Sequence, residues 1–261
     1  MSELAEPLTS DQVDQFITRG FVRLRAAFPR SVADACVRLM WGQIRARADS
    51  PETWTQPVIR HPAWDDERFD RAVNTARLQM AFDQLVGPGR WRPRRHPGLF
   101  VIRFPSSDDP GDTGWHIDGS FDVGGEWWVN LHSRGRALLM LFLFTDVGLD
   151  DAPTRVLVGS HRDVPPILEP IGDAGTHFDR VVPMIPHVHE RETALAIGEA
   201  GDVYLCHPFL VHAATWPHRS ASPRFLAQPE LPPVAPLDLD RQDGDYSPVE
   251  IAVRLGLGLA G

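Results

Sequence analysis

Gly114-Trp115-His116-Ile117-Asp118-Gly119 is the stretch of the sequence that decides the fold. Its alternation of polar and apolar side chains predicts an extended strand, in which successive side chains point to opposite faces. His116 and Asp118 therefore share one face, and Ile117 points into the other layer. An imidazole and a carboxylate on one face are two of the three ligands of a 2-His-1-carboxylate facial triad. This arrangement holds non-haem Fe(II) and leaves coordination positions open.

A third ligand is expected near the end of residues 201–212. Gly201-Asp202 is a turn signal, and the apolar triplets on either side of residues 206–208 are typical of two short strands. His212 ends the second of these strands and is the candidate third ligand. His207 lies between the two strands and is the alternative.

A His-x-Asp motif alone carries little information. The chain has 11 histidines, and His161-Arg162-Asp163 and His177-Phe178-Asp179 fit the same pattern. Most such pairs are solvated surface groups, so the assignment of His116 and Asp118 depends on their surroundings.

Two arginines stand in predicted strands near this site. Arg224 opens a short strand in Ser222-Pro223-Arg224-Phe225-Leu226, and Arg103 lies in the strand Leu99–Phe104. The planar guanidinium group binds a carboxylate with two hydrogen bonds, which Lys cannot match. Arg224 is therefore the candidate for binding a carboxylate ligand. Arg103 either faces the substrate or co-substrate or forms a structural ion pair, and the sequence does not decide between these.

Four stretches together resemble the phytanoyl-CoA dioxygenase family of Fe(II)/2-oxoglutarate oxygenases. Residues 8–22 are similar to the family's opening helix and first strand, and Trp115-His116-Ile117-Asp118 matches its metal motif. Residues 152–162 resemble the family's Gly-Pro-Leu-x-Val-x-Pro-Gly-Ser-His strand and turn. Residues 201–212, followed by Arg224, match the distal half. In this order and spacing the stretches cover most of the chain.

The resemblance implies the ligands and the co-substrate of the site. His116, Asp118 and His212 are expected to bind Fe(II). The family's distal ligand follows the apolar triplet, where His212 stands rather than His207. The resemblance also implies that 2-oxoglutarate chelates the metal, that its far carboxylate pairs with Arg224, and that O2 takes the remaining position. Further candidates for the co-substrate site are residues in neighbouring strands and turns, namely Arg103, Thr154 and Thr215.

One turn departs from the family pattern His-Gly-Ser-x-Pro-Asn-x-Ser. After the distal ligand this chain reads Ala213-Ala214-Thr215-Trp216-Pro217-His218-Arg219-Ser220, one residue longer. Ala214 has no hydroxyl where the family has a Ser that helps to hold 2-oxoglutarate, so Thr215 is the candidate replacement. Arg219 is a second candidate for the carboxylate, but it lies in the turn, and Arg224 is preferred.

The reaction that the resemblance implies is hydroxylation of a small-molecule metabolite at an unactivated carbon, with release of succinate and CO2. Asp118 favours oxygenation over halogenation, because related halogenases have a small residue at this position. Desaturation and ring formation are alternatives to hydroxylation. Candidate substrate contacts are three side chains near the metal motif, Trp115, Trp128 and Asn130.

Two other classes of protein are consistent with the same pattern. The altered turn after His212 fits a non-catalytic jelly-roll module that binds metal. The fold also serves cupin-like isomerases and hydrolases that use Zn(II) or Mn(II), which commonly have an extra His or Glu ligand. No such residue is spaced to join His116 and Asp118. Arg224 argues against both classes, because a buried Arg has no evident role without 2-oxoglutarate.

Composition excludes several kinds of partner. The 261 residues are 43% hydrophobic, enough for a large core, and the net charge of −9 argues against nucleic acid, which requires a basic face. The longest apolar run, Ala137–Phe144, is too short to cross a bilayer, and Met1–Pro7 lacks the apolar segment of a signal peptide. Cys36 and Cys206 make no disulfide framework, which favours a reducing cytoplasm. The sequence does not indicate the oligomeric state.

The order of predicted elements favours an α+β fold. Helices are expected at 9–20, from Ser31 and at 67–85, and Pro51–His61 is expected to be a loop. From Gly98 onward short apolar strands with regular turns predominate. The resemblance identifies this strand region as a double-stranded β-helix, a cupin-like jelly-roll, with the N-terminal helices packed around it.

We expect a single domain over residues 1–261. Residues 1–97 are the mainly helical flank, and residues 98–228 are the jelly-roll core. Within the core, residues 161–198 are irregular and are interpreted as a lid, because a long loop in a compact domain is usually functional. Residues 229–261 form a C-terminal extension.

Overall fold

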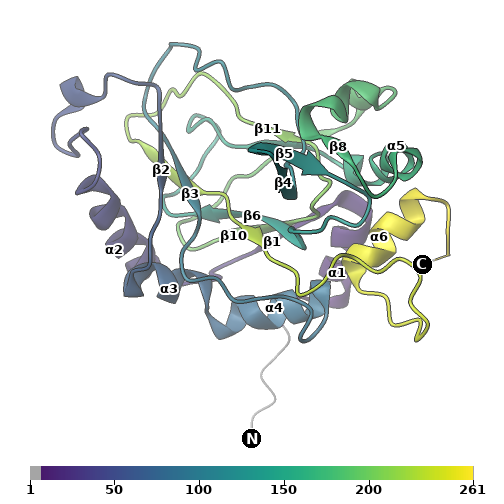
Figure 1. Ribbon diagram of the computed structural model, residues 1–261. Coiled ribbons are helices and arrows are strands. Elements are labelled where there is room, and N and C mark those ends of the chain that lie inside the picture. The colour runs from purple at the N-terminus through teal and green to yellow at the C-terminus, as the bar shows by residue number, and fades with distance from the viewer. Residues whose placement is uncertain (1–6, 261) are drawn as a thin grey trace, which may run out of the picture.

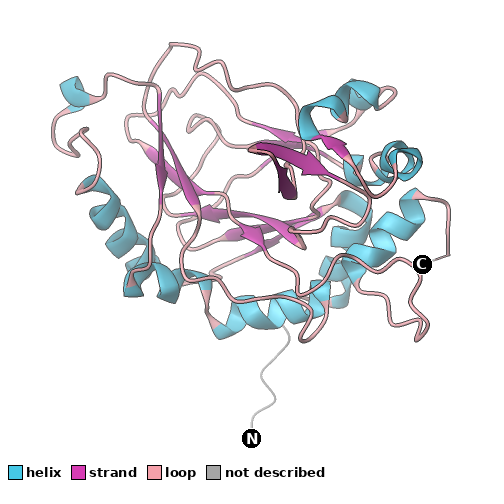
Figure 2. Cartoon of the chain, in the orientation of Figure 1, coloured by secondary structure: helices cyan, strands magenta, loops and turns pink. Residues whose placement is uncertain are grey.

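The computed structural model describes residues 7–260, except for the side chain of His189. Residues 1–6 and residue 261 lie outside the described part. The expectation about a signal peptide concerned Met1–Pro7 and therefore falls almost wholly outside it. Helices line one side and one end of a β core (Figure 1), and long loops join its strands (Figure 2). The described helices and strands give the α+β composition that the sequence predicts.

The main layer is an antiparallel sheet with the strand order β1-β10-β6-β12-β3-β2, and β13 also pairs with β6. Its strands are β1 (Phe21–Leu24), β2 (Val58–Pro62), β3 (Leu99–Arg103), β6 (Leu138–Leu143), β10 (Val203–Cys206), β12 (Arg224–Ala227) and β13 (Glu230–Leu231). The loop expected at Pro51–His61 is therefore wrong in its second half, because β2 pairs with β3 along its whole length. β1 and β2 show that the N-terminal flank contributes two strands to the sheet.

Two three-stranded sheets lie above the main sheet in Figure 1 and have the orders β11-β7-β9 and β4-β5-β8. Their strands are β4 (Phe121–Val123), β5 (Glu126–Val129), β7 (Arg155–Leu157), β8 (Thr176–His177), β9 (Thr193–Leu195) and β11 (His212–Ala213). β4 and β5 form a hairpin whose turn, Gly124-Gly125, has φ angles of 64° and 91°. Glycine adopts this left-handed region without strain, which fixes the place of the turn.

The helices are α1 (Ser10–Arg19), α2 (Arg30–Trp41), α3 (Glu67–Val73), α4 (Ala76–Val86), α5 (Pro165–Leu168) and α6 (Pro248–Gly256). α1 begins with the expected capping box between Thr9 and Gln12 and ends at Gly20, which has a left-handed φ of 87°. α2 begins earlier than expected, with Pro29 rather than Ser31 before its first turn. The helix expected at 67–85 is two helices, because the Thr75 hydroxyl accepts a hydrogen bond from Leu78 N and starts α4 anew.

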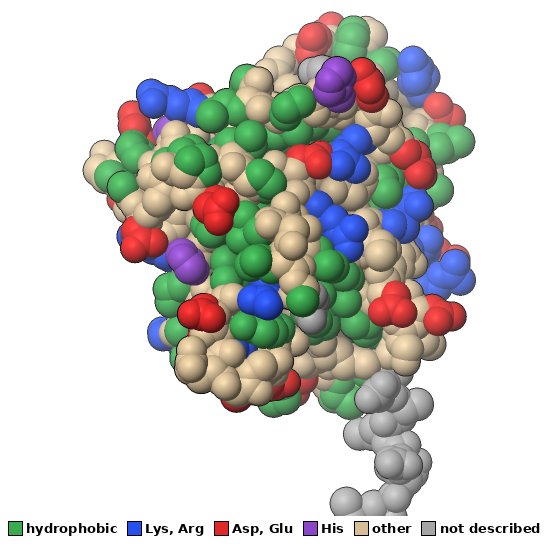
Figure 3. Space-filling model, turned by 90° about the vertical axis from the view of Figure 1, so that its right-hand side faces the viewer, with side chains coloured by type: hydrophobic (Ala, Val, Ile, Leu, Met, Phe, Trp, Pro, Cys, Tyr) green, Lys and Arg blue, Asp and Glu red, His purple; other side chains and the backbone are tan. Residues whose placement is uncertain are grey.

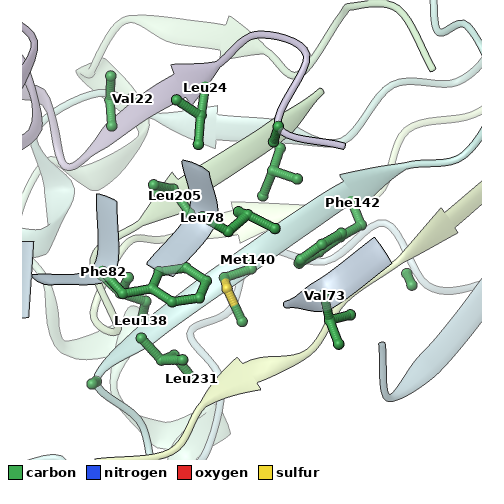
Figure 4. Packing of buried hydrophobic residues seen from close by; sticks show 14 of the residues in the cluster. Val22, Leu24, Val73, Leu78, Phe82, Leu138, Met140, Phe142, Leu205 and Leu231 are labelled. Atoms are coloured by element: carbon green, nitrogen blue, oxygen red, sulfur yellow. The ribbon is translucent and has the colours of Figure 1, made fainter. Parts of the chain in front are cut away.

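The core has two apolar faces that meet at β6, whose six residues are all buried. On one face Met140 and Phe142 pack with Leu78 and Phe82 of α4, as Figure 4 shows. Alternate residues of β6, including Leu141, belong to a second cluster between the main sheet and the smaller sheets. A strand with an apolar layer on each side needs a continuous apolar run, which explains the sequence 137–144.

The region 161–198 contains short helical turns and two short strands rather than a structureless loop. Its 3-10 helices are Ser160–Arg162, Glu169–Ile171, Phe178–Arg180, Val182–Met184 and Val188–Glu190; a further one, Pro51–Thr53, lies in the flank. β8 joins this region to β5, and β9 joins it to β7. The proposed lid is thus attached to both smaller sheets at the side of the core that holds the site.

Within residues 7–260, none of the helices has the length and apolar character needed to span a bilayer. Figure 3 looks onto the side of the molecule that carries α5 and α6. Acidic, basic and hydrophobic side chains are interspersed over it. This distribution gives that face no uniformly basic surface of the kind that nucleic-acid binding requires.

Candidate metal centre and its cavity

His116 and His212 are brought together by their backbones. His116 N donates to His212 O at 3.0 Å, and His212 N donates to His116 O at 2.9 Å. This pair is an isolated β-bridge. The strand expected at 114–119 is therefore wrong, because only one residue of this segment, His116, is paired. The strand expected at 209–211 is also displaced, and β11 begins at His212 itself.

Three candidate ligand atoms, from His116, Asp118 and His212, all lie within 4.8 Å of one another. Asp118 Oδ1 is 3.6 Å from His212 Nε2 and 4.0 Å from His116 Nε2. Two imidazole nitrogens and one carboxylate oxygen at this spacing can contact one ion on a single face, which is the donor set of non-haem Fe(II) sites.

Hydrogen bonds at the far side of each imidazole fix its orientation. His116 Nδ1 lies 2.9 Å from Gly114 O, and His212 Nδ1 lies 3.0 Å from Leu210 O. Because a carbonyl only accepts, each Nδ1 carries a proton, and each Nε2 is the ring nitrogen that faces Asp118. Such bonds hold a histidine in the tautomer that binds metal. The three residues therefore fit an Fe(II) ion.

The electrostatics of the triad favour the protonation states that a metal requires. Burial lowers the pKa of His212 to about 4, so the ring is neutral at pH 7. Burial is the largest single influence on Asp118 and opposes its charge, but the groups around it, first Arg136, with Nη1 3.2 Å from Asp118 Oδ2, and then His212 and His116, together lower the pKa of Asp118. The sequence analysis missed Arg136, which lies in the turn before β6, because no motif connects it with Asp118.

A cavity of about 400 Å³ opens beside the triad. Its wall combines the triad with the cavity-facing side of β2, β3 and β12 and with parts of the smaller sheets. The lining residues are Arg60, Leu99, Val101, Arg103, Asp112, His116, Asp118, Gly119, Trp127, Arg136, Thr154, Phe178, His212, Ala214, Arg224, Leu226, Gln228 and Glu230.

Strand register places the lining residues in rows. Arg224 lies opposite Arg103, and Leu226 lies opposite Val101. One row further, Gln228 N donates to the backbone oxygen of Leu99 at 3.1 Å. Because side chains of a strand alternate, residues two apart face the same cavity. Along β12 the cavity wall therefore presents first two guanidinium groups, then the apolar side chains of Leu226 and Val101, and then the amide of Gln228.

Arg224 is a buried cation, with 2% of its surface exposed. Its Nη1 donates to Ala152 O, and its Nε has no hydrogen-bond partner. Among the described residues no carboxylate lies within 4.0 Å of it. Burial, together with the positive charge of Arg103, lowers the pKa of Arg224 to about 9, so that the group stays charged at pH 7. A buried charge without a counterion is costly, and this one faces a cavity that an anion can fill.

Arg103 forms the structural ion pair that was one of its two expected roles. Its Nη2 lies 2.7 Å from both carboxylate oxygens of Asp112. Arg60 donates to the same carboxylate. Arg103 also lines the cavity beside Arg224. Arg103 and Arg60 therefore share the carboxylate of Asp112, whereas Arg224 has no carboxylate partner among the described residues.

The two threonines proposed for the co-substrate site differ in position. Thr154 is buried and lines the cavity. The hydroxyl of Thr215 donates to Pro153 O at 2.6 Å, and Thr215 lies outside the cavity wall. Ala214, the residue without a hydroxyl, faces the cavity in its place.

The three residues proposed for substrate contact do not line the cavity. The guanidinium carbon of Arg155 lies 4.2 Å from the ring centre of Trp115, which packs against the core. Asn130 is 1% exposed and donates to Asp173 O at 3.1 Å. Trp128 Nε1 is buried.

Trp127 and Phe178 line the cavity instead, and the sequence analysis did not select them. Successive residues of β5 face opposite sides, so the neighbour of Trp128 is the one that reaches the site. Phe178, in the 3-10 helix Phe178–Arg180, lies with its ring centre 6.5 Å from that of His116. Its place could have been found only by knowing how the region 161–198 folds.

His207 and the two other His-x-Asp motifs lie away from the metal cluster. His207 is fully buried, and its ring centre is 4.9 Å from that of His161. His161 is within hydrogen-bonding distance of Ile17 O, at 3.0 Å, so this pair packs beneath α1. His177 pairs with Asp179 at 2.5 Å within the region 161–198. None of these histidines belongs to the metal cluster found among the described residues.

The sequence matches the profile of the phytanoyl-CoA dioxygenase (PhyH) family over residues 23–226. None of the curated protein sequences matches the chain. The family match covers the metal motif, the distal histidine and Arg224, and it ends before the C-terminal extension.

Solved structures share the fold. HygX from Streptomyces hygroscopicus, with nickel, 2-oxoglutarate and hygromycin B bound, has a TM-score of 0.57 and 18% identity over 87% of this chain and 88% of its own. The epimerase SnoN in complex with Fe3+, alpha ketoglutarate and nogalamycin RO has a TM-score of 0.58 and 17% identity over 84% and 80%. The carbocyclase SnoK from nogalamycin biosynthesis has a TM-score of 0.56 and 18% identity over 92% and 90%.

These likenesses confirm the expected cupin-like jelly-roll, with helices packed against its main sheet. The family profile spans most of the chain and confirms the expectation of a 2-oxoglutarate-dependent dioxygenase. The chain belongs to the phytanoyl-CoA dioxygenase family.

Proposed function

We propose that this protein is an Fe(II)- and 2-oxoglutarate-dependent oxygenase that hydroxylates a small-molecule metabolite at an unactivated carbon, with release of succinate and CO2. The observation that carries the proposal is Arg224, a buried guanidinium group without a carboxylate partner among the described residues. It lies in the same cavity as the cluster of His116, Asp118 and His212.

His116, Asp118 and His212 would hold the Fe(II) ion. When bound, Fe(II) supplies the activation of O2 that is coupled to decarboxylation of 2-oxoglutarate. The chain orients both imidazoles through Gly114 O and Leu210 O. Asp118 adds one negative charge, and it occupies the position that a small residue has in related halogenases, which supports oxygenation rather than halogenation.

Arg224 would bind the far carboxylate of 2-oxoglutarate. Its fork geometry suits two parallel hydrogen bonds to a carboxylate, and the low polarity around a buried group strengthens them. Thr154 lies on the same cavity wall and offers a hydroxyl. Arg103 acts from the neighbouring strand, and its charge is balanced by Asp112. Water is largely excluded here, since Arg224 and Arg103 are 2% and 3% exposed.

The substrate would approach from the opposite end of the cavity. Arg224 and Gln228 are four residues apart on β12, roughly 13 Å along an extended strand. The cavity wall also carries Leu99, Trp127 and Phe178, which suit an apolar or ring-bearing part of a molecule. HygX is known with hygromycin B and SnoN with nogalamycin RO, both small molecules. A small-molecule substrate is the corresponding proposal here.

Two further expectations remain part of this proposal. The chain is taken as one domain over residues 1–261, with residues 161–198 as a lid. A cytoplasmic location is supported by Cys36 and Cys206, which are buried free thiols rather than a disulfide.

The test is anaerobic addition of Fe(II) and then 2-oxoglutarate to the purified protein. We expect the weak visible charge-transfer band of a chelated 2-oxo acid, and we expect it to be absent in His212→Ala. Binding of Fe(II) without the band would contradict the co-substrate assignment and favour a non-catalytic metal-binding module. Product analysis then separates hydroxylation from other outcomes, because SnoN and SnoK are described as an epimerase and a carbocyclase.

A further inference from the structure

Among the described residues, Gln228 is the one amide side chain on the cavity wall, and it lies directly against the candidate metal centre. Its Nε2 is 2.9 Å from Nε2 of His212. Its backbone is held in the main sheet, because Gln228 N donates to Leu99 O. The contact is therefore between a fixed strand and the ligand atom of the distal histidine.

The direction of this hydrogen bond follows from the other nitrogen of the ring. His212 Nδ1 carries the proton, because it lies 3.0 Å from Leu210 O, and a carbonyl can only accept. His212 Nε2 is then an acceptor with one lone pair in the ring plane. The amide N–H of Gln228 donates to that lone pair, which is the same lone pair that a metal ion would use.

A metal ion and the amide of Gln228 therefore exclude each other at His212 Nε2. A nitrogen with one available lone pair cannot both accept this hydrogen bond and coordinate a metal. Metal binding must break the contact and turn the amide away. Gln228 lines the cavity, which gives the released amide open space beside it.

We propose that Gln228 is a positioning residue whose amide changes its hydrogen-bond partner when the metal binds. The amide leaves His212 and turns to a ligand in the cavity. In the metal-free protein its amide keeps the imidazole of His212 in place and competes with the metal. In the loaded protein the released amide faces the cavity, where it can donate to a hydroxyl or carbonyl oxygen of a bound molecule. The inference rests on the proposed metal site of His116, Asp118 and His212.

The experiment is a calorimetric titration of the metal-free, full-length protein with Ni(II), which is redox-stable and prefers imidazole and carboxylate ligands. Gln228→Leu removes the competing donor with little change of volume. We expect it to bind Ni(II) about fivefold more tightly than the unmodified protein, the factor that corresponds to one net hydrogen bond. A gain of affinity cannot result from damage to the fold.

Leu226→Met is the matched control, because residue 226 faces the same cavity two positions earlier and has no polar group; its Ni(II) affinity should equal that of the unmodified protein. Gln228→Met, which keeps the chain length, should repeat the gain seen with Leu. Unchanged or weaker Ni(II) binding in both Gln228 variants overturns the inference, since the amide would then support or join the site. Ni(II) binding that survives in His212→Ala would instead contradict the proposed metal site itself.

Discussion

At the metal end of the cavity each histidine ligand is oriented by a carbonyl oxygen two residues earlier in the chain, whereas at the Arg224 end the charged groups are oriented by partners far apart in sequence. His116 bonds to Gly114 O, and His212 bonds to Leu210 O. Asp112, by contrast, joins arginines from β2 and β3. The orientation of the imidazoles at the metal end is set locally, whereas the charges at the co-substrate end are paired by the packing of the sheet.

This difference has a consequence for how each end responds to change. Loss of the Asp118 carboxylate leaves both imidazoles in place, because each is held by its own backbone contact. At the Arg224 end, loss of one charge leaves its neighbours unpaired in a buried place, which costs stability as well as binding.

Asp118→Ala should have the largest effect. It removes the only carboxylate of the candidate metal cluster, so we expect metal affinity to fall by more than about 100-fold, since even outer contacts to metal ligands are worth 10–100-fold. Oxygenation should be lost with it. Calorimetric Ni(II) titration measures the first effect. An unchanged circular dichroism spectrum shows that the fold survives, and full activity in this variant would remove Asp118 from the site.

The same contrast explains which residues of the site could be predicted from the sequence. His116, Asp118 and His212 could be selected because a motif and an apolar strand pattern place them, and the structure brings their ligand atoms together. Trp128 was selected in place of Trp127, because composition alone does not tell which of two adjacent aromatic side chains of β5 faces the cavity.

The remaining misses depend on long-range packing. Arg136 reaches Asp118 from a turn 18 residues later, and Asp112 reaches β2 and β3 from a loop. No sequence motif marks Arg136 or Asp112, because each meets its partners only when the sheet has folded. The break between α3 and α4, in contrast, was readable, because Thr75 is a typical N-cap residue inside the helix expected at 67–85.

Arg224→Lys should separate the two ends. Lysine keeps the charge but cannot offer two parallel hydrogen bonds to a carboxylate, so we expect 2-oxoglutarate affinity to fall about 30-fold, the size of one charged hydrogen bond. Ni(II) affinity should stay within about twofold, because Arg224 is not in the metal cluster. Arg219→Lys, in the turn, is the control and should change neither. An equal loss of both affinities would mean that Arg224 is structural.

Asp112→Asn should destabilise the fold more than it changes the metal site. It leaves Arg103, which is 3% exposed, without a counterion. We expect the free energy of unfolding to fall by about 2 kcal/mol, less than for a fully buried pair because Asp112 is partly exposed. Urea denaturation measures this. The matched control is Asp49→Asn, whose exposed pair with Arg47 should contribute little. Equal losses of unfolding free energy in the two variants would show that the pair of Asp112 with Arg103 stabilises the fold no more than an exposed pair does.

Acid should destabilise the Arg224 end through His218. Burial, together with the positive charge of Arg224, lowers the pKa of His218 to about 4. Because the unfolded chain takes up the proton near pH 6.5, stability is complete above that pH and is lost as the pH falls toward 4. His218→Gln should reduce the loss between pH 6.5 and 5 by on the order of 1 kcal/mol. Urea denaturation of the metal-free proteins at both pH values checks this, and an unchanged loss would contradict it.

Thr215→Val should have the smallest effect on binding, although Thr215 is the hydroxyl that the sequence offers in place of the family's Ser. Its hydroxyl is already bonded to Pro153 O, and the side chain lies outside the cavity wall. We expect 2-oxoglutarate affinity to change by less than about twofold, with a loss of about 1 kcal/mol of stability from the missing hydrogen bond. Thr154→Val, on the cavity wall, should weaken 2-oxoglutarate binding more. If Thr215→Val proved the more damaging of the two, the turn would have to rearrange around the co-substrate, and the contrast between a locally built end and a packed end would fail at this position.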